Sequence, residues 1–165
     1  YVKTAYGFRS PSGMKMDNTT RYALGLLIII TLVQVLIGTQ VRQQIDVIAK
    51  SLDMQSRDLW ISKLDWIFKF HRSFSLLVLI GNGWVVYQIL KYLHHYFAVY
   101  RAGIYLAVFV GIAALSGIIM AYLNVPSWAQ PVHLVLSCLI FGTQVYLFFA
   151  LGRKTQIRTK SMTSI

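Results

Sequence analysis

The sequence contains four apolar stretches, each long enough to cross a membrane. They cover about residues 21–41, 65–91, 102–123 and 129–152. A helix of about 20 apolar residues spans the hydrocarbon core of a bilayer. Within that core only helices and closed barrels satisfy every backbone polar group. The sequence therefore predicts an all-α protein, a transmembrane four-helix bundle.

The composition agrees with an integral, multi-pass membrane protein. Of the 165 residues, 56% are hydrophobic and 13% are charged, whereas a soluble domain carries about 25% charged residues. The net charge of +11 would suit a nucleic acid partner, but the basic residues lie mostly between and beyond the apolar stretches. Lysine and arginine at such positions orient membrane helices. We therefore expect contact with membrane lipid and no nucleic acid partner.

The segment between the first two stretches has the pattern of an amphipathic helix. From residue 43 to residue 64, apolar residues recur at helical spacing, and acid–base pairs four residues apart occupy the opposite face. The apolar residues are Ile45, Ile48, Leu52 and Leu59, and the pairs are Asp46–Lys50 and Asp53–Arg57. We expect an outer amphipathic helix between helices one and two, lying on the membrane surface or capping the bundle.

Basic residues are divided unequally between the two ends of the predicted bundle. Four crossings place both termini on one side, where ten basic residues accompany one acid, and the other side has six basic residues and four acids. The positive-inside rule then places both termini in the cytoplasm. In this interpretation residues 1–20 are a cytoplasmic connector, 21–152 the four-helix domain and 153–165 a basic cytoplasmic tail.

Two histidines lie near the starts of the second and fourth apolar stretches. His71 follows Asp65 by six residues and His133 follows Trp128 by five, so both lie about 7–9 Å into their helices on the same side. An ionisable side chain inside a membrane usually faces the bundle interior and a partner. Each histidine could simply form a hydrogen bond between helices. We favour shared ligation of one haem iron, because imidazole is a good axial ligand and two histidines alone lack the further ligands that zinc requires.

Two arginines accompany the histidines on the same side. Arg72 follows His71 directly, and Arg42 ends the first helix. Arginine binds carboxylates through paired hydrogen bonds, so each is a candidate to bind the haem propionates; the alternative is contact with lipid headgroups. We expect no carboxylate within the four helices, and Phe68 stands three residues before His71. The sequence thus predicts a cofactor site without a catalytic residue of its own.

Three short motifs resemble haem A synthase, the membrane enzyme that converts haem O to haem A for terminal oxidases. They are Leu-Ile-Gly-Thr-Gln-Val-Arg at 36–42, His71-Arg72, and Val-His-Leu at 132–134, and the resemblance covers about residues 21–151. That family has eight helices in two similar halves, each with histidines on its second and fourth helices. The N-terminal half has a glutamate three residues before the first of these histidines and converts the substrate, whereas the C-terminal half holds haem B.

The resemblance implies that this chain is the C-terminal half, because Phe68 occupies the glutamate position. His71 and His133 would then be the iron ligands of haem B, in a half that transfers electrons and is not catalytic alone. The chain begins at Tyr1 rather than Met, so we expect a missing N-terminal catalytic half as its partner. Further candidate partners are haem O synthase and a second copy of the chain, and the expected location is a bacterial cell membrane.

Two other hypotheses remain open from the sequence. The first is a self-contained b-type cytochrome for quinol-linked electron transfer, which often has a second haem near the inner side; the adjacent His94 and His95 are the only histidines expected there. The second is a scaffold or assembly subunit without a cofactor, in which both buried histidines only form hydrogen bonds.

Overall fold

The computed structural model describes residues 18–53 and 56–162, and the side chains of 19–53 and 56–152. The described residues form four long helices and one short 3-10 helix, and they contain no strand. These elements are α1 (Asn18–Ser51), η1 (Arg57–Leu59), α2 (Trp66–Tyr92), α3 (Phe97–Tyr122) and α4 (Ala129–Met162). All four long helices are long and apolar enough to cross a membrane. The predicted all-α class with four membrane helices is confirmed; the predicted connector and tail fall largely outside the described residues.

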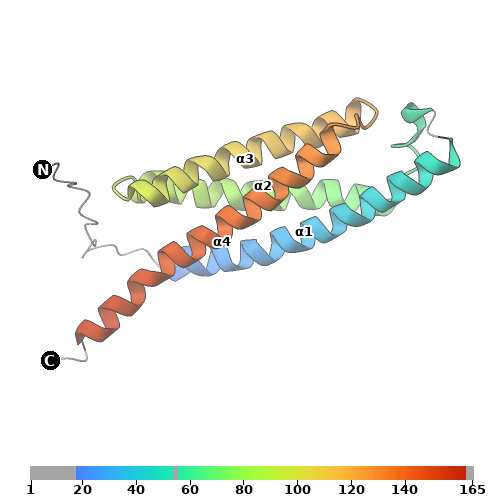
Figure 1. Ribbon diagram of the computed structural model, residues 1–165. Coiled ribbons are helices and arrows are strands. Elements are labelled where there is room, and N and C mark those ends of the chain that lie inside the picture. Colours follow the sequence, from blue (N-terminus) through green and yellow to red (C-terminus); the bar gives the residue numbers. More distant parts are fainter. Residues whose placement is uncertain (1–17, 54–55, 163–165) are drawn as a thin grey trace, which may run out of the picture.

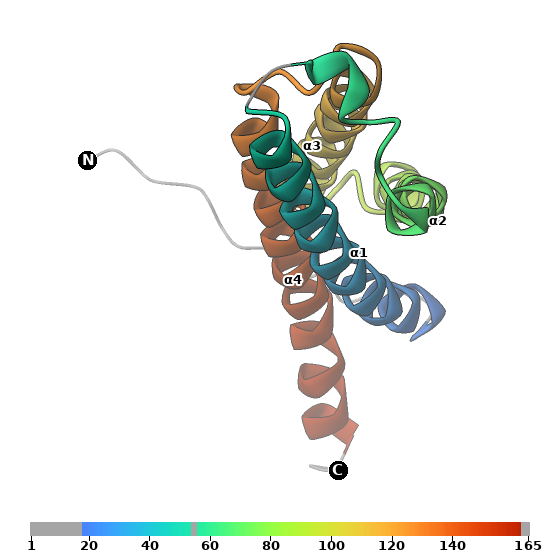
Figure 2. The same cartoon turned by 90° about the vertical axis from the view of Figure 1, so that its right-hand side faces the viewer.

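The four helices form a ring in chain order (Figure 1 and Figure 2). Each packs against its neighbours in the sequence, and α1 also packs against α4, which closes the ring. Consequently α2 and α4 lie diagonally across the bundle, as do α1 and α3. One end of the bundle carries η1 and the starts of α2 and α4, and we call it the η1 end (Figure 1). The opposite end carries the start of α1 and the loop between α2 and α3.

The larger apolar core occupies the opposite end and the middle of the bundle. All four helices contribute fully buried side chains to it. Its largest members are Leu24 of α1, Ile89 of α2, Leu106 of α3 and Leu147 of α4, each with no exposed surface. Such tight packing holds membrane helices together, because surrounding lipid is as apolar as the core and hydrophobic burial gives little net gain.

A second, smaller core lies at the η1 end. The prediction of a separate amphipathic helix in this region is wrong. The segment 43–64 is not a separate helix: α1 continues to Ser51, and only η1 follows before α2. No proline or glycine interrupts residues 42–51, so the helix continues beyond the apolar stretch. Most of the predicted apolar face nevertheless packs inward, since Ile45 is buried and Ile48 and Leu52 pack against the same cluster, whereas Leu59 is exposed. The buried members of this cluster are Val41, Ile45, Ala49, Trp60, Leu64 and Val125.

Two other helix boundaries also differ from those expected. α3 begins at Phe97 rather than at residue 102, and α4 continues past Gly152 to Met162. Neither added segment contains proline, and after Gly152 there is no further glycine, so nothing in the backbone chemistry ends the helices earlier. The apolar span within α4 still ends at Gly152, as the sequence predicts.

The turn between α3 and α4 is anchored by Val125. Asn124 and Val125 have φ values of 57° and 49°. This left-handed region is unfavourable for a β-branched residue. Val125 is only 1% exposed and belongs to the second core, so its burial offsets the backbone cost and fixes where α4 begins.

Three polar side chains meet inside the bundle and join three helices. The amide nitrogen of Gln144 on α4 donates to Thr31 Oγ1 of α1 at 3.0 Å and to Asn82 Oδ1 of α2 at 2.9 Å. Gln144, Asn82 and Thr31 are 0%, 1% and 3% exposed. Hydrogen bonds between helices inside a membrane contribute about 0.6 kcal/mol each on average. This polar triad, which the sequence analysis did not predict, fixes the register of α4 against α1 and α2.

Replacing Gln144 with Leu should destabilise the bundle by about 1 kcal/mol, because two hydrogen bonds between helices are lost. The measurement is the free energy of unfolding in mixed micelles, followed by circular dichroism. Gln88→Leu is the matched control: it makes the same chemical change on α2 at a residue without a hydrogen bond to any described side chain. Equal effects of the two substitutions would contradict the structural role of the triad.

Candidate functional site

His71 lies on α2, five residues after its start, and packs against α1. Its ring is so close to Gly38 that a Cβ added to this glycine would lie 3.1 Å from the ring atom Cε1. The Gln34 amide nitrogen donates to the His71 carbonyl at 3.1 Å and lies 3.5 Å from the His71 Nε2 atom. The buried Nδ1 atom has no hydrogen-bond partner among the described residues. Since 3.5 Å is too long for a strong hydrogen bond, both ring nitrogens retain bonding capacity.

His133 lies on α4, four residues after its start, and is held by α3. Its Nδ1 atom lies 3.1 Å from the Ala113 carbonyl and 2.8 Å from Ser116 Oγ. The same carbonyl also accepts a hydrogen bond from Ser116 at 2.8 Å. Because a carbonyl can only accept, the Ala113 contact assigns the ring proton to Nδ1. In the neutral ring, Nε2 is then left with the lone pair that binds a metal.

The structure brings the two predicted histidines to the same end of the bundle on diagonally opposite helices. Both lie within the first two turns of their helices at the η1 end (Figure 1). Each is half-buried and rests against a glycine of the preceding helix, Gly38 for His71 and Gly117 for His133. The two histidines are therefore candidates for one shared site at the η1 end.

The histidine site coincides with a break between the two apolar cores. On α1 no apolar side chain is buried between Leu27 and Val41, and on α2 none is buried before Val85. On α3 the buried residues at this depth are small, namely Ala113 and Ser116, whereas on α4 Leu136 is buried one turn after His133. Cofactor sites in helical bundles are built from side chains on facing helices. At the histidines α1, α2 and α3 thus contribute no bulky buried apolar side chain to the bundle interior.

This arrangement has the donor chemistry of a two-histidine metal or haem site. A metal-binding imidazole usually donates its other ring N–H to a carbonyl or carboxylate, which fixes its tautomer and orientation. His133 already makes that contact with Ala113. No group of three or more His, Cys, Asp or Glu side chains suited to a free metal ion occurs among the described residues. A haem needs only two protein ligands, because the porphyrin supplies the other four.

The structure places both candidate arginines near this site. Arg42 lies one turn beyond Gly38 on the same face of α1, and its Nε donates to both carboxylate oxygens of Asp46 at 3.3 Å. Both partners are about half exposed, and exposed ion pairs of this kind are weak, so Arg42 can exchange its partner. Arg72 is exposed and has neither an ion pair nor a side-chain hydrogen bond within the described part of the chain. Both guanidinium groups are thus available to an acidic ligand.

The site has no carboxylate beside His71. The expectation that no carboxylate lies within the four long helices is wrong, however. Asp46 lies within α1, whereas we expected no carboxylate in the long helices. The cause is the extension of α1: Asp46 is two turns beyond Gly38, about 12 Å along the axis, where its side chain is exposed. Phe68 is half-buried and packs against the second core. The position one turn before His71 is therefore used for packing.

Sequence reasoning missed the residues that hold the two rings. They are Gln34 and Gly38 on α1, and Ala113, Ser116 and Gly117 on α3. A usable signal was present, because in each helix a polar or small residue is followed by a glycine at the spacing of one turn. Such pairs mark the face where helices approach closely.

Substituting Gly38 with Ala should move the His71 ring, because the new Cβ would lie 3.1 Å from Cε1, closer than an ordinary contact. Gly117→Ala should leave His133 in place, since its Cβ would lie at an ordinary 3.5 Å. The measurement is NMR of isotope-labelled histidine in micelles, with Gly83→Ala, which meets nothing within 4 Å, as control. If the His71 signals shift no more with Gly38→Ala than with the control, the close packing described here is wrong.

Comparison with known proteins identifies the family. The sequence matches the family model COX15-CtaA, described as a cytochrome oxidase assembly protein, over residues 2–145. Neither the curated proteins nor the solved structures compared with the chain gave a match. The family match covers most of the sequence, confirms the resemblance to haem A synthase, and together with four membrane-spanning helices supports an integral membrane protein. The chain therefore belongs to the COX15-CtaA family of cytochrome oxidase assembly proteins, the haem A synthase family.

Proposed function

We propose that this chain is the haem B-binding half of a haem A synthase-type membrane oxidoreductase, with His71 and His133 as the two iron ligands. The observation that carries this proposal is the position of two histidines on diagonal helices at the same end of the bundle. The break in apolar packing around them supports it. So does membership of a family that acts in cytochrome oxidase assembly.

The protein would orient the groups that bind the haem and would keep water away from it. The Ala113 carbonyl and the Ser116 hydroxyl hold the His133 ring with Nε2 as its free donor. Gly38 lets α1 approach the His71 ring closely. A bound haem supplies one-electron transfer, and a pair of imidazole ligands is suited to that chemistry rather than to activation of oxygen, because it leaves the iron no open position.

The two arginines are proposed to bind the haem propionates. Arg72 is adjacent to a ligand and lacks a carboxylate partner among the described residues. Arg42 would exchange Asp46 for a propionate, which is the same class of partner. Arg42 and Arg72 would then hold a haem by its carboxylate groups, at the end of the site nearer η1.

We further propose that substrate oxidation takes place in a partner half and that this half carries electrons to or from it. Phe68 occupies the position that the family resemblance assigns to a catalytic glutamate, and its ring is packed in the second core. Other proposed contacts are with haem O synthase or a second copy of this chain.

The proposed membrane orientation places the opposite end in the cytoplasm. Counted over the whole sequence, ten basic residues belong to the side that carries both termini and six to the η1 side. Arg21, Lys91 and Arg101 are members of the first group that lie on the described helices. This distribution follows the positive-inside rule. The histidine site would then be near the outer face of the membrane.

Purified protein loaded with haem B tests the ligand assignment. His71→Ala and His133→Ala should each abolish the low-spin haem absorbance, because each removes one of two axial ligands. His94→Ala and His95→Ala are matched controls: both residues are exposed in the loop between α2 and α3, at the opposite end. Unchanged haem spectra and content in both ligand variants would rule out the proposal.

The same preparation tests the arginines. Arg72→Gln and Arg42→Gln should weaken haem retention by about tenfold, the size of one charge-assisted hydrogen bond, while the low-spin spectrum of the bound fraction persists. Arg101→Gln, at the opposite end of the bundle, should leave retention unchanged. Equal retention in all three variants would exclude propionate binding by Arg72 and Arg42.

A further inference from the structure

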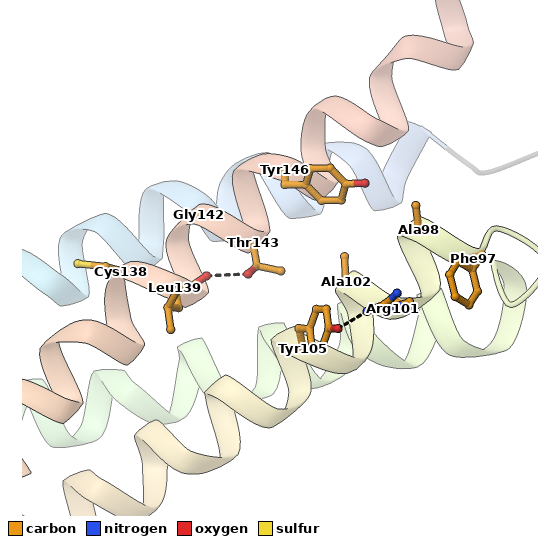
Figure 3. Close-up of a pocket in the computed structure, with 10 residues that line it drawn as sticks. All are labelled: Phe97, Ala98, Arg101, Ala102, Tyr105, Cys138, Leu139, Gly142, Thr143 and Tyr146. Carbon is orange, nitrogen blue, oxygen red and sulfur yellow. Dashed lines mark hydrogen bonds between the residues drawn. The ribbon is translucent and has the colours of Figure 1, made fainter. Parts of the chain in front are cut away.

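We propose that a groove between α3 and α4, on the outer surface of the bundle, binds an anionic phospholipid of the surrounding membrane. Its phosphate would bind Arg101, and an acyl chain would run along α4 toward Cys138. The groove opens on the outer surface of the bundle near the opposite end (Figure 3). Its occupant is therefore separate from the haem.

The groove exists because small residues line its floor. Ala98 and Ala102 of α3 and Gly142 of α4 leave a space of about 530 Å³ between the helices, within the range of small-molecule sites. Tyr105 and Tyr146 stand at its sides (Figure 3). A Cβ added to Gly142 would meet no other atom within 4 Å, so this part of the groove is open space.

Arg101 supplies an oriented positive charge at the shallow end of the groove. Its Nη2 atom donates to the Tyr105 hydroxyl at 2.6 Å, and its guanidinium carbon lies 5.3 Å from the centre of the Phe97 ring. These contacts use only some of the five N–H donors of the guanidinium group. The remaining N–H groups can form paired hydrogen bonds with a phosphate. Within residues 18–53 and 56–152 the single ion pair is Arg42–Asp46, so the charge of Arg101 is not neutralised by a described carboxylate.

The polarity along the groove matches that of a phospholipid. Arg101 is four residues after the start of α3, about 6 Å into the helix, a depth from which arginine reaches lipid headgroups. Cys138 and Leu139 lie deeper, because Cys138 precedes the end of the α4 span at Gly152 by 14 residues, about 21 Å along the axis. The side chains around this deep end are apolar and exposed, including Val135 and Leu139. A phospholipid has a charged headgroup at one end and an apolar acyl chain at the other, so it fits a groove that is charged at its shallow end and apolar at its deep end.

A fluorophore on Cys138 tests the proposal directly. Cys138 is the only cysteine of the chain, is exposed, and lines the groove. The protein labelled there is placed in bilayers containing either phosphatidylglycerol or phosphatidylcholine with brominated acyl chains, which quench the fluorophore on contact. Quenching should be stronger with brominated phosphatidylglycerol at equal mole fraction. Arg101→Gln should lower this preference about tenfold, as expected for one charge-assisted contact.

Two matched controls separate the groove from general charge and packing effects. Lys91→Gln removes a basic residue at the same end that also bonds a tyrosine hydroxyl, Tyr87, but lies outside the groove; it should preserve the preference. Gly142→Leu fills the groove and should reduce quenching by both lipids. Gly83→Leu, where a Cβ also meets nothing within 4 Å, should not.

Three results would overturn the proposal. The first is equal quenching by the two brominated lipids in the unmodified sequence. The second is an equal loss of preference in Arg101→Gln and Lys91→Gln. The third is protection of the fluorophore from both lipids in a protein that cross-links as an oligomer, because a second copy of the chain would then cover the groove.

Discussion

Polar side chains buried between these helices depend on partners within the protein, because a bilayer core offers them none. This constraint organises the interior of the bundle. Gln144 joins α4 to α1 and α2 through Thr31 and Asn82, and His133 joins α4 to α3 through Ala113. Apolar packing alone would permit the helices to slide or rotate, since lipid competes equally for apolar surface. The hydrogen bonds select one arrangement.

The polar groups follow a repeat between the two halves of the bundle. Asn82 lies eleven residues after His71, and Gln144 lies eleven residues after His133. Eleven residues are about three turns of helix, so each histidine shares a helix face with the amide that bonds across the bundle. Asn82 and Gln144 are hydrogen-bonded to each other, which aligns α2 and α4 and places the two histidines at matching depth. The triad thus positions the histidine site although it touches neither ring.

The membrane spans and the paired histidines could be predicted from the sequence because each depends only on residues close together in the chain. Apolar length marks a membrane helix, and an ionisable residue inside it stands out against the apolar background. The sequence did not predict that α1 continues to Ser51, because polar residues after the span end the apolar signal without ending the helix. Nor did it predict Gln144 with Thr31, or Ser116 with His133, since such partners depend on how helices rotate about their axes. Arg42 was placed on the correct side, but its pairing with Asp46 follows from the unforeseen extension.

The two histidines differ in a way that bears on how a cofactor would be held. His133 is oriented by a carbonyl and a hydroxyl, whereas His71 has an unpartnered nitrogen and a glycine behind its ring. One imidazole is thus preorganised, and the other keeps a nitrogen without a hydrogen-bond partner among the described residues. The central claim is that both bind one haem iron together, and electron paramagnetic resonance during titration with haem B tests it most directly. The account predicts a single low-spin signal with two imidazole ligands that saturates at one haem per chain. A high-spin signal, or saturation at any other ratio, would contradict it.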